Sequence, residues 1–256
     1  MNYLIFAFYD RDGIIDFHVL DSLQKYCNSF KIIFVSNVIL SKKEKKKINF
    51  VRHIIEKEHN EKDFGSWKIG INFIKNKKIN TLLLVNDSVI GPLKEFSEIL
   101  SVMKKKECDF WGITSAGEGD TFHLQSYFLF FKKNVIRSKC FKNFFQNVKK
   151  VSSKSELVKL YEIGLTQQLI NNGFKCSSFL HSFKKDIHSN VKFYSLIKTN
   201  KLPFLKVKNL VSNPFRLPRM SSVLKTVNSS DKLLNYVKRI NRSKDISHLY
   251  YFLPQF

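Results

Sequence analysis

The feature that most restricts the fold is an alternation of short apolar runs with stretches of helical periodicity. The runs Ile5–Tyr9, Lys31–Ser36 and Thr81–Val85 are apolar, aromatic and β-branched, which is typical of buried parallel strands. Between them, Ile15–Cys27 and Trp67–Asn76 carry apolar residues at helical spacing. Strands that alternate with helices predict an α/β fold, a mostly parallel sheet flanked by helices on both faces.

The same alternation continues beyond the third strand. Cys108–Thr114 and Ser126–Phe131 are the next expected strands, and Ser155–Asn172 is a long expected helix that ends at Gly173, a usual C-cap. After about residue 205 the pattern changes: a breaker-rich linker precedes a basic helical tail over Ser221–Asn241. We therefore expect one domain over residues 1–215 and a basic C-terminal extension over residues 216–256.

Composition excludes several other classes of protein. Hydrophobic residues are 43% and charged residues 25% of the 256, which is ordinary for a globular chain and excludes wholesale disorder. No apolar run approaches the roughly 20 residues that span a bilayer, and the N-terminal run reads as a strand rather than a signal peptide. The four cysteines form no CxxC pair, so neither a zinc site nor a disulfide framework is indicated. A cytoplasmic location is the default expectation.

The net charge is unusual. Lys and Arg number 44 against 21 Asp and Glu, which gives +23. Such a field attracts anions: nucleic acid, acidic lipid or phosphorylated small molecules. The alternative is compositional drift, because most of the excess is lysine in a chain that is also rich in Asn, Ile and Phe. No RRM, KH or helix-turn-helix signature accompanies the charge, so no nucleic acid is expected as a partner.

Polar residues that directly follow the apolar runs are the candidates for chemistry, because open α/β sheets bind ligands at the carboxyl ends of their strands. Three places qualify: Tyr9–Asp10, Ser36–Asn37 and Asn86–Ser88. Asp87 is the most suggestive, since a carboxylate there can hold a divalent cation that in turn holds a diphosphate. The alternative is that Asn86–Ser88 merely cap a turn.

The usual signatures of nucleotide and hydrolase sites are missing. The sequence contains no GxGxxG, GxxxxGK[ST], HExxH or GxSxG. Phosphates would have to be held by a metal, by helix N-termini or by basic side chains.

Two further segments mix polar and aromatic residues. His59–Lys68 is either part of a site or a loop with a helix start in which Asp63 caps and Trp67 packs. Phe122–Tyr127 leads into a strand, where His123 and Gln125 lie on one side of an extended chain. A single histidine is more often structural, so this segment alone is a weak indication.

Taken together, these segments resemble the rhamnan synthesis protein F family of bacterial glycosyltransferases. The resemblance covers roughly residues 3 to 215 and is carried by His59–Lys68, Asn86–Pro92, Phe110–Thr114, His123–Phe128, Tyr161–Thr166 and Leu202–Val207. It implies a GT-A-like, Rossmann-type sheet with an acidic metal-binding motif after a central strand. That motif is often DxD, whereas Asn86–Ser88 offers the single carboxylate of Asp87.

The resemblance also implies a reaction. Such enzymes build O-antigen, capsule or cell-wall polysaccharides, and the donor most often implied is dTDP-β-L-rhamnose, used with inversion. Diphosphate charge must be neutralised, here by Mg²⁺ or Mn²⁺ held by Asp87, and an acceptor hydroxyl must lose its proton to a carboxylate. The alternatives are an inactive transferase-fold scaffold for polysaccharide assembly and a basic nucleic-acid-binding protein.

The expected site residues follow from these requirements. Donor contacts are expected from Tyr9, Asp10, Ser36, Asn37, Asn60, Asp63, Trp67, Lys68, Asn86, Asp87 and Ser88, and acceptor contacts from Trp111, His123, Gln125 and Ser126.

Glu162 is the expected general base. Inverting GT-A enzymes commonly carry an acidic pair at a helix start, and Glu162–Leu165 with Gly173 matches that frame, with Tyr161 in place of the first acid. Asp120 is the next candidate. The alternative is that Glu162 is a surface glutamate or only orders neighbouring backbone.

A lipid-linked glycan is the implied acceptor, which places the protein at the inner membrane face. The basic residues of the tail are expected to meet anionic headgroups there: Lys225, Lys232, Lys238, Arg239, Arg242 and Lys244. A merely solvated basic helix is the alternative.

Overall fold

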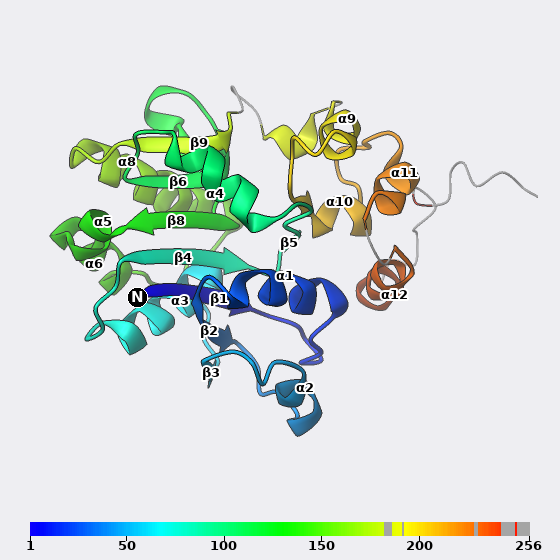
Figure 1. Cartoon of the computed structure of the whole chain (residues 1–256), viewed down its shortest axis with the longest axis horizontal. Helices are drawn as coiled ribbons and strands as arrows, with labels where there is room; N and C mark the ends of the chain where they lie inside the picture. The colour runs from blue at the N-terminus through cyan, green and yellow to red at the C-terminus, as the bar shows by residue number, and fades with distance from the viewer. Residues whose placement is uncertain (182–185, 191, 228–229, 242–248, 250–256) are drawn as a thin grey trace, which may run out of the picture.

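The computed structural model describes residues 1–181, 186–190, 192–227, 230–241 and 249 (Figure 1). The strands are β1 (Asn2–Phe8), β2 (Lys31–Ser36), β3 (His53–Glu56), β4 (Thr81–Asn86), β5 (Val89–Ile90), β6 (Phe110–Ala116), β7 (His123–Leu124), β8 (Phe128–Lys132), β9 (Cys176–Leu180) and β10 (Leu205–Lys206). The α-helices are α1 (Phe17–Cys27), α2 (Lys42–Lys47), α3 (Lys62–Ile74), α4 (Phe96–Lys104), α5 (Lys133–Arg137), α6 (Lys139–Gln146), α7 (Lys154–Leu157), α8 (Gly164–Asn171), α9 (Phe193–Lys198), α10 (Val207–Val211), α11 (Met220–Lys225) and α12 (Ser230–Ile240). Short 3₁₀ turns are η1 (Gly119–Thr121) and η3 (Ile187–Ser189), and η2 (Val158–Ile163) is a π-helical turn.

The main sheet has the order β3-β2-β1-β4-β8-β6-β7, with β9 also pairing with β6. Strands β1 to β4 pair in parallel, and β9 is parallel to β6. This helix-flanked, mostly parallel mixed sheet confirms the predicted α/β class. One strand differs from the expectation: β8 is antiparallel to both β4 and β6, because the connection from β6 is too short for the crossover that a parallel neighbour requires.

Two apolar clusters cover the two faces of this sheet. Side chains of β1 alternate between them: Leu4, Phe6 and Phe8 pack toward α1 and α4, while Tyr3, Ile5 and Ala7 pack toward α3, α6 and α8. Helix α3 lies very close to β1 because residue 70 is glycine. A Cβ at Gly70 would lie 2.5 Å from Cγ2 of Ile5.

A third apolar cluster joins the C-terminal helices to β5 and β10. Its buried members include Ile90, Phe193, Leu205, Met220 and Val237. The boundary predicted at residue 215 falls inside this cluster, so α11 and α12 pack with α9 and α10 as one layer. The tail predicted to be helical over Ser221–Asn241 contains two helices, α11 and α12. Figure 1 shows this layer beside the carboxyl ends of β1 and β4.

None of the helices in the described ranges is long and apolar enough to cross a membrane.

Candidate functional site

The carboxyl ends of three parallel strands meet at one edge of the sheet. Ala7 of β1 is opposite Asn86 of β4, and the Asn37 N–H after β2 donates to the carbonyl of Phe8 at 3.0 Å. Because β8 is antiparallel to β4, with Phe128 opposite Val85, the residues before β8 reach the same edge. The expected donor and acceptor segments are therefore brought together, although they are distant in sequence.

Asp87 lies in the turn that follows β4. Its Oδ2 accepts the N–H of Tyr9 at 2.7 Å, which ties β4 to the residue after β1. Within the turn, the N–H and hydroxyl of Ser88 donate to Oδ1 of Asn86 at 3.2 and 2.6 Å. The turn capping that was the alternative for this segment is thus present, and it fixes the Asp87 carboxyl at the edge of the sheet.

Asp63 lies beside this turn rather than at a helix cap. It belongs to the first turn of α3, and its Oδ2 accepts the side-chain amide of Asn86 at 2.7 Å. Burial raises the pKa of Asp63 to about 6; the charge of Glu162 adds to the effect, and the Asn86 hydrogen bond opposes it. Asp63 is therefore hydrogen-bonded to the turn of Asp87 and is also repelled by the charge of Glu162.

The pKa of Asp87 is higher still. Burial raises it to about 8, with further contributions from the charges of Asp63 and Asp10, while the Tyr9 N–H opposes the shift. Asp10, Asp63, Asp87 and Glu162 thus form a chain of carboxyl groups that repel one another. Positive charge brought to this edge would favour the ionised forms.

A divalent cation at this edge would need the phosphate oxygens of a bound substrate as further ligands. Within the described ranges, no three His, Cys, Asp or Glu side chains are grouped to hold a metal ion. Asp87 offers one carboxyl group, and one of its oxygens already accepts the Tyr9 N–H. Mg²⁺ is commonly held by one or two carboxylates together with substrate phosphates. Asp87 fits that arrangement and does not fit an all-protein metal cage.

Glu162 faces the same edge from the π-helical turn η2. Its Oε1 accepts the hydroxyl of Ser126 at 2.7 Å, and its Oε2 lies 3.8 Å from Nε2 of His123. The Glu162 side chain is 18% exposed, so it is held in place yet reachable by a ligand. A π-helical turn re-aims side chains relative to a regular helix and occurs frequently at functional sites. His123, Ser126 and Glu162 are therefore one polar group.

Asp120, the second carboxylate proposed for catalysis, is more exposed than Glu162 and lies on the turn η1. With Thr121 it lines a hollow of about 690 Å³ whose other wall includes Lys154, Val158 and Ile163. This hollow lies alongside the turn that carries Glu162.

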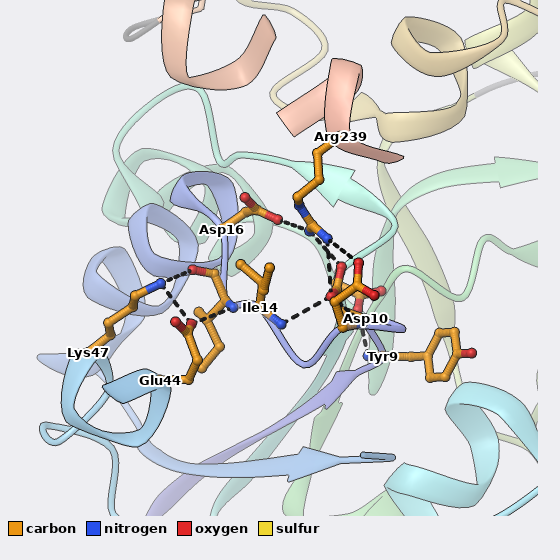
Figure 2. A network of polar contacts seen from close by, with 10 residues as sticks. Tyr9, Asp10, Ile14, Asp16, Glu44, Lys47 and Arg239 are labelled. Carbon is orange, nitrogen blue, oxygen red and sulfur yellow. Dashed lines mark hydrogen bonds and ion pairs between the residues drawn. The ribbon is translucent and has the colours of Figure 1, made fainter. Parts of the chain in front are cut away.

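The loop after β1 is held by the C-terminal layer (Figure 2). The guanidinium of Arg239 on α12 donates to Oδ2 of Asp10 at 2.6 Å and also pairs with Asp16 and, at 3.3 Å, with Asp12. Asp10 itself accepts the N–H of Ile14 at 3.0 Å. Arg239 was expected at a membrane surface; instead it is the counter-ion of this acidic loop. Arg242 and Lys244 lie outside the described residues.

Several residues expected at the site have side chains that are buried in the core. Trp111 is 2% exposed and stacks on Phe130 with ring centroids 4.9 Å apart, so it does not reach an acceptor. Trp67 is fully buried and donates its Nε1–H to the carbonyl of Val85 at 3.1 Å. Ser36 is also fully buried, and its hydroxyl donates to the carbonyl of Val38.

Other expected residues are occupied in local structure. Gln125 is buried and accepts the hydroxyl of Thr114 at 2.6 Å. Asn37 pairs with the backbone of His59 through both side-chain atoms. Lys68 donates to the carbonyl of Val148, and Asn60 is exposed before α3. None of these four side chains joins the group around Asp87 and Glu162.

Two basic contributions were missed from the sequence. Arg239 lies 229 residues after Asp10, a separation that no local pattern reveals. The backbone that carries Lys206 and Lys208 meets the residues after Asp87, through pairing of β10 with β5 and the Val207 N–H on the carbonyl of Ser88. Lys206 lies in the segment Leu202–Val207, which carries part of the family resemblance, and Lys208 directly follows that segment.

Comparison with known families identifies the chain. A family model described as Rhamnan synthesis protein F matches residues 32–249. The chain belongs to the rhamnan synthesis protein F family. This is a family of glycosyltransferases, and the chain is a glycosyltransferase.

Individual relatives are more distant. The virulence protein VirA of Vibrio anguillarum is 27% identical over 222 residues, which cover 73% of this chain and 71% of that protein. An uncharacterized protein, y4gN of Sinorhizobium fredii, is 24% identical and covers 68% of this chain and 47% of its own length.

Two solved structures have a similar course of the chain. A putative nucleotide-diphospho-sugar transferase from Desulfovibrio desulfuricans G20 has a TM-score of 0.46 at 13% identity, covering 95% of this chain and 99% of that chain. S. aureus TarS, residues 1–349, has a TM-score of 0.47 at 12% identity, covering 95% and 73%.

Proposed function

We propose that this transferase moves a sugar from a nucleoside-diphosphate donor bound at the carboxyl ends of β1 and β4 to an acceptor hydroxyl presented at Glu162. The observation that carries the proposal is the convergence of Asp87, after β4, with Glu162, before α8, at one edge of the sheet. An inverting displacement requires the leaving diphosphate and the general base to lie on opposite sides of the bound sugar.

On the donor side, the turn Asn86–Ser88 and the residues Tyr9 and Asp10 form the floor of the proposed site. Asp63 supports the turn through Asn86. Asp87 would hold Mg²⁺ or Mn²⁺ together with the donor's diphosphate. When bound, the ion supplies positive charge that neutralises the leaving group.

On the acceptor side, Glu162 would accept the proton of the attacking hydroxyl. Ser126 fixes one carboxyl oxygen of Glu162, and His123 lies beside the other. The second oxygen therefore faces a histidine rather than a fixed donor, which leaves it available to an acceptor. If Glu162 is not the base, Asp120 is the next candidate.

The sugar and the acceptor are proposed from the family. A family described by rhamnan synthesis supports L-rhamnose, carried as dTDP-β-L-rhamnose and transferred with inversion. The product would be O-antigen, capsule or cell-wall glycan, which belongs to lipopolysaccharide-type and related polysaccharide biosynthesis. A lipid-linked acceptor would place the protein in the cytoplasm, in peripheral contact with the inner membrane face.

A donor panel tests the proposal. dTDP-, UDP- and GDP-sugars, each with and without Mg²⁺ or Mn²⁺, are assayed for thermal stabilisation of the protein and for release of nucleoside diphosphate. We expect one donor class to stabilise and to turn over slowly.

Asp87→Ala is the matched variant for this panel. We expect it to fold, because Asn86 and Ser88 still form the turn, and to lose transfer. Full activity and undiminished nucleotide affinity of Asp87→Ala, measured by calorimetry, would show that the donor site is placed wrongly.

A further inference from the structure

The segment Lys206–Lys208 of the C-terminal layer is bonded through its backbone to the residues that follow Asp87. Strand β10 pairs antiparallel with β5, with Lys206 opposite Val89, and the N–H of Val207 donates to the carbonyl of Ser88 at 2.9 Å. Ser88 directly follows Asp87. Lys208 directly follows Val207, so its backbone is held near the turn that carries Asp87, although 121 residues separate Lys208 from Asp87 in sequence.

The two lysines of this segment differ in their partners. The ammonium of Lys206 lies 2.8 Å from Oδ2 of Asp186 and is thereby neutralised. Lys208 pairs with no carboxylate among the described residues, and its Nζ lies 4.5 Å from the centre of the Phe215 ring. Lys208 is also half-buried. It is a partly desolvated cation without an anion.

The surroundings of Lys208 favour an incoming anion. Its pKa is lowered, mainly by burial and then by the charge of Lys206, with Lys154 adding to the effect. Asp186 and Glu162 oppose this shift, so Glu162 lies within electrostatic range of Lys208. Lys208 thus follows a residue whose backbone is bonded to the turn of Asp87, and its side chain lies within electrostatic range of the base proposed above.

We propose that Lys208 binds the diphosphate of the nucleotide-sugar donor and positions it as the leaving group. This rests on the proposed function. The bond from the anomeric carbon to the phosphate oxygen breaks, and its electron pair stays on that oxygen, giving the nucleoside diphosphate. The acceptor oxygen bonds to the anomeric carbon, and its proton goes to Glu162. Lys208 remains an ammonium throughout and opposes the charge that develops on the diphosphate.

Lysine suits this role chemically. Its ammonium is a compact charge with three donors on a flexible stem, and such lysines are common phosphate ligands. The Phe215 ring under the ammonium restricts where the ammonium lies, which reduces the ordering cost of binding.

Binding measurements on charge variants test Lys208. Calorimetry with dTDP, UDP and GDP as probes is run on the wild type, Lys208→Met, Lys208→Arg and Lys201→Met. Met retains an apolar stem over Phe215, Arg retains the charge, and Lys201 is an exposed lysine before β10. We expect Lys208→Met to bind the preferred diphosphate at least about tenfold more weakly, which is about 1.4 kcal/mol. Lys208→Arg should recover part of this, and Lys201→Met should match the wild type.

The outcomes separate this inference from the proposed function. Binding by Lys208→Met within about twofold of the wild type would overturn the role of Lys208 and leave the proposed function standing. A loss of affinity that Lys208→Arg does not reduce would also overturn it, because packing rather than charge would then be responsible. A wild type that binds none of the three diphosphates contradicts the proposed function, and the role of Lys208 with it.

Discussion

His18 is a buried titratable residue that links α1 to α12. It is 3% exposed, and its ring lies 4.3 Å from that of Tyr236. Burial lowers the pKa of His18 to about 4; the Asp87 backbone carbonyl opposes this shift, as does the charge of Asp10, whereas Arg239 adds to it. The folded protein therefore keeps His18 neutral at neutral pH.

Stability should fall with acidification because of His18. The unfolded chain binds the proton near the ordinary histidine pKa of about 6.5. The depressed pKa of His18 therefore costs no stability above that pH. As the pH falls from about 6.5 toward 4, the free energy of unfolding decreases by up to about 1.4 kcal/mol per pH unit. His18→Phe should show a shallower loss in urea denaturation at pH 7, 6 and 5. The exposed His53→Phe is the control and should follow the wild type; equal pH dependence in all three proteins would refute this account.

At single residues, the sequence placed polar groups at the edge of the sheet where they directly follow β1 and β4. Tyr9, Asp10 and Asp87 lie at the expected edge because strand ends are readable from apolar runs. Trp111 and Trp67 are buried in the core, which was not foreseen because an aromatic residue near a polar motif carries no sign of which face of its element it occupies. Whether Glu162 is the base stays a prediction, although its position beside Ser126 and His123 is favourable.

Helix α12 is attached to the β1–α1 loop through Arg239. The guanidinium faces Asp10, Asp12 and Asp16, and its side chain is 24% exposed. Asp12 is more than half exposed, so its contact is largely screened by solvent. The contacts with Asp10 and Asp16 therefore carry most of the attachment.

Arg239→Met should destabilise the protein and leave its secondary structure intact. Loss of the counter-ion leaves three carboxylates facing one another, and we expect a cost between about 1 kcal/mol, as for exposed pairs, and about 3 kcal/mol, as for buried ones. Urea denaturation measures it. Lys232→Met, on the same helix and exposed to solvent, is the control and should change stability by less than about half a kcal/mol. An Arg239→Met protein as stable as Lys232→Met would show that the acidic loop does not need this cation.

Elements with a simple apolar signature were predicted best. Strand β2 was expected at Lys31–Ser36 and lies there, and β1 and β4 differ by a few residues at their ends. The reversal of β8 was not predicted, because a buried run looks the same in either direction. Strand β9 (Cys176–Leu180) was not predicted because its polar residues and partial burial resemble a loop. The π-helical turn was likewise read as regular helix, since its apolar spacing changes little.

At the scale of the whole molecule, the fold gives a structural role to only some of the basic residues that produce the net charge of +23. Within the described C-terminal layer, Lys225, Lys232 and Lys238 are exposed, whereas Arg239 is paired. An exposed lysine near an anionic surface contributes about 1 kcal/mol to attachment. We propose that these lysines make a peripheral, salt-sensitive contact with an anionic membrane surface.

Flotation with liposomes measures this contact. We expect recovery with anionic vesicles at physiological salt, little recovery with neutral ones, and weaker recovery of a Lys225→Glu/Lys238→Glu variant. Identical behaviour with anionic and neutral vesicles would remove membrane attachment from the account.

The central claim is that Glu162 is the base of a sugar transfer whose donor lies at Asp87. Steady-state kinetics of Glu162→Gln with the donor identified in the panel tests it most directly, because glutamine keeps the size and the Ser126 contact but accepts no proton. The account predicts a kcat lower by about 10²–10⁴-fold with a nearly unchanged KM for the donor. A variant that retains more than about half of the wild-type kcat would contradict it and move the base to Asp120.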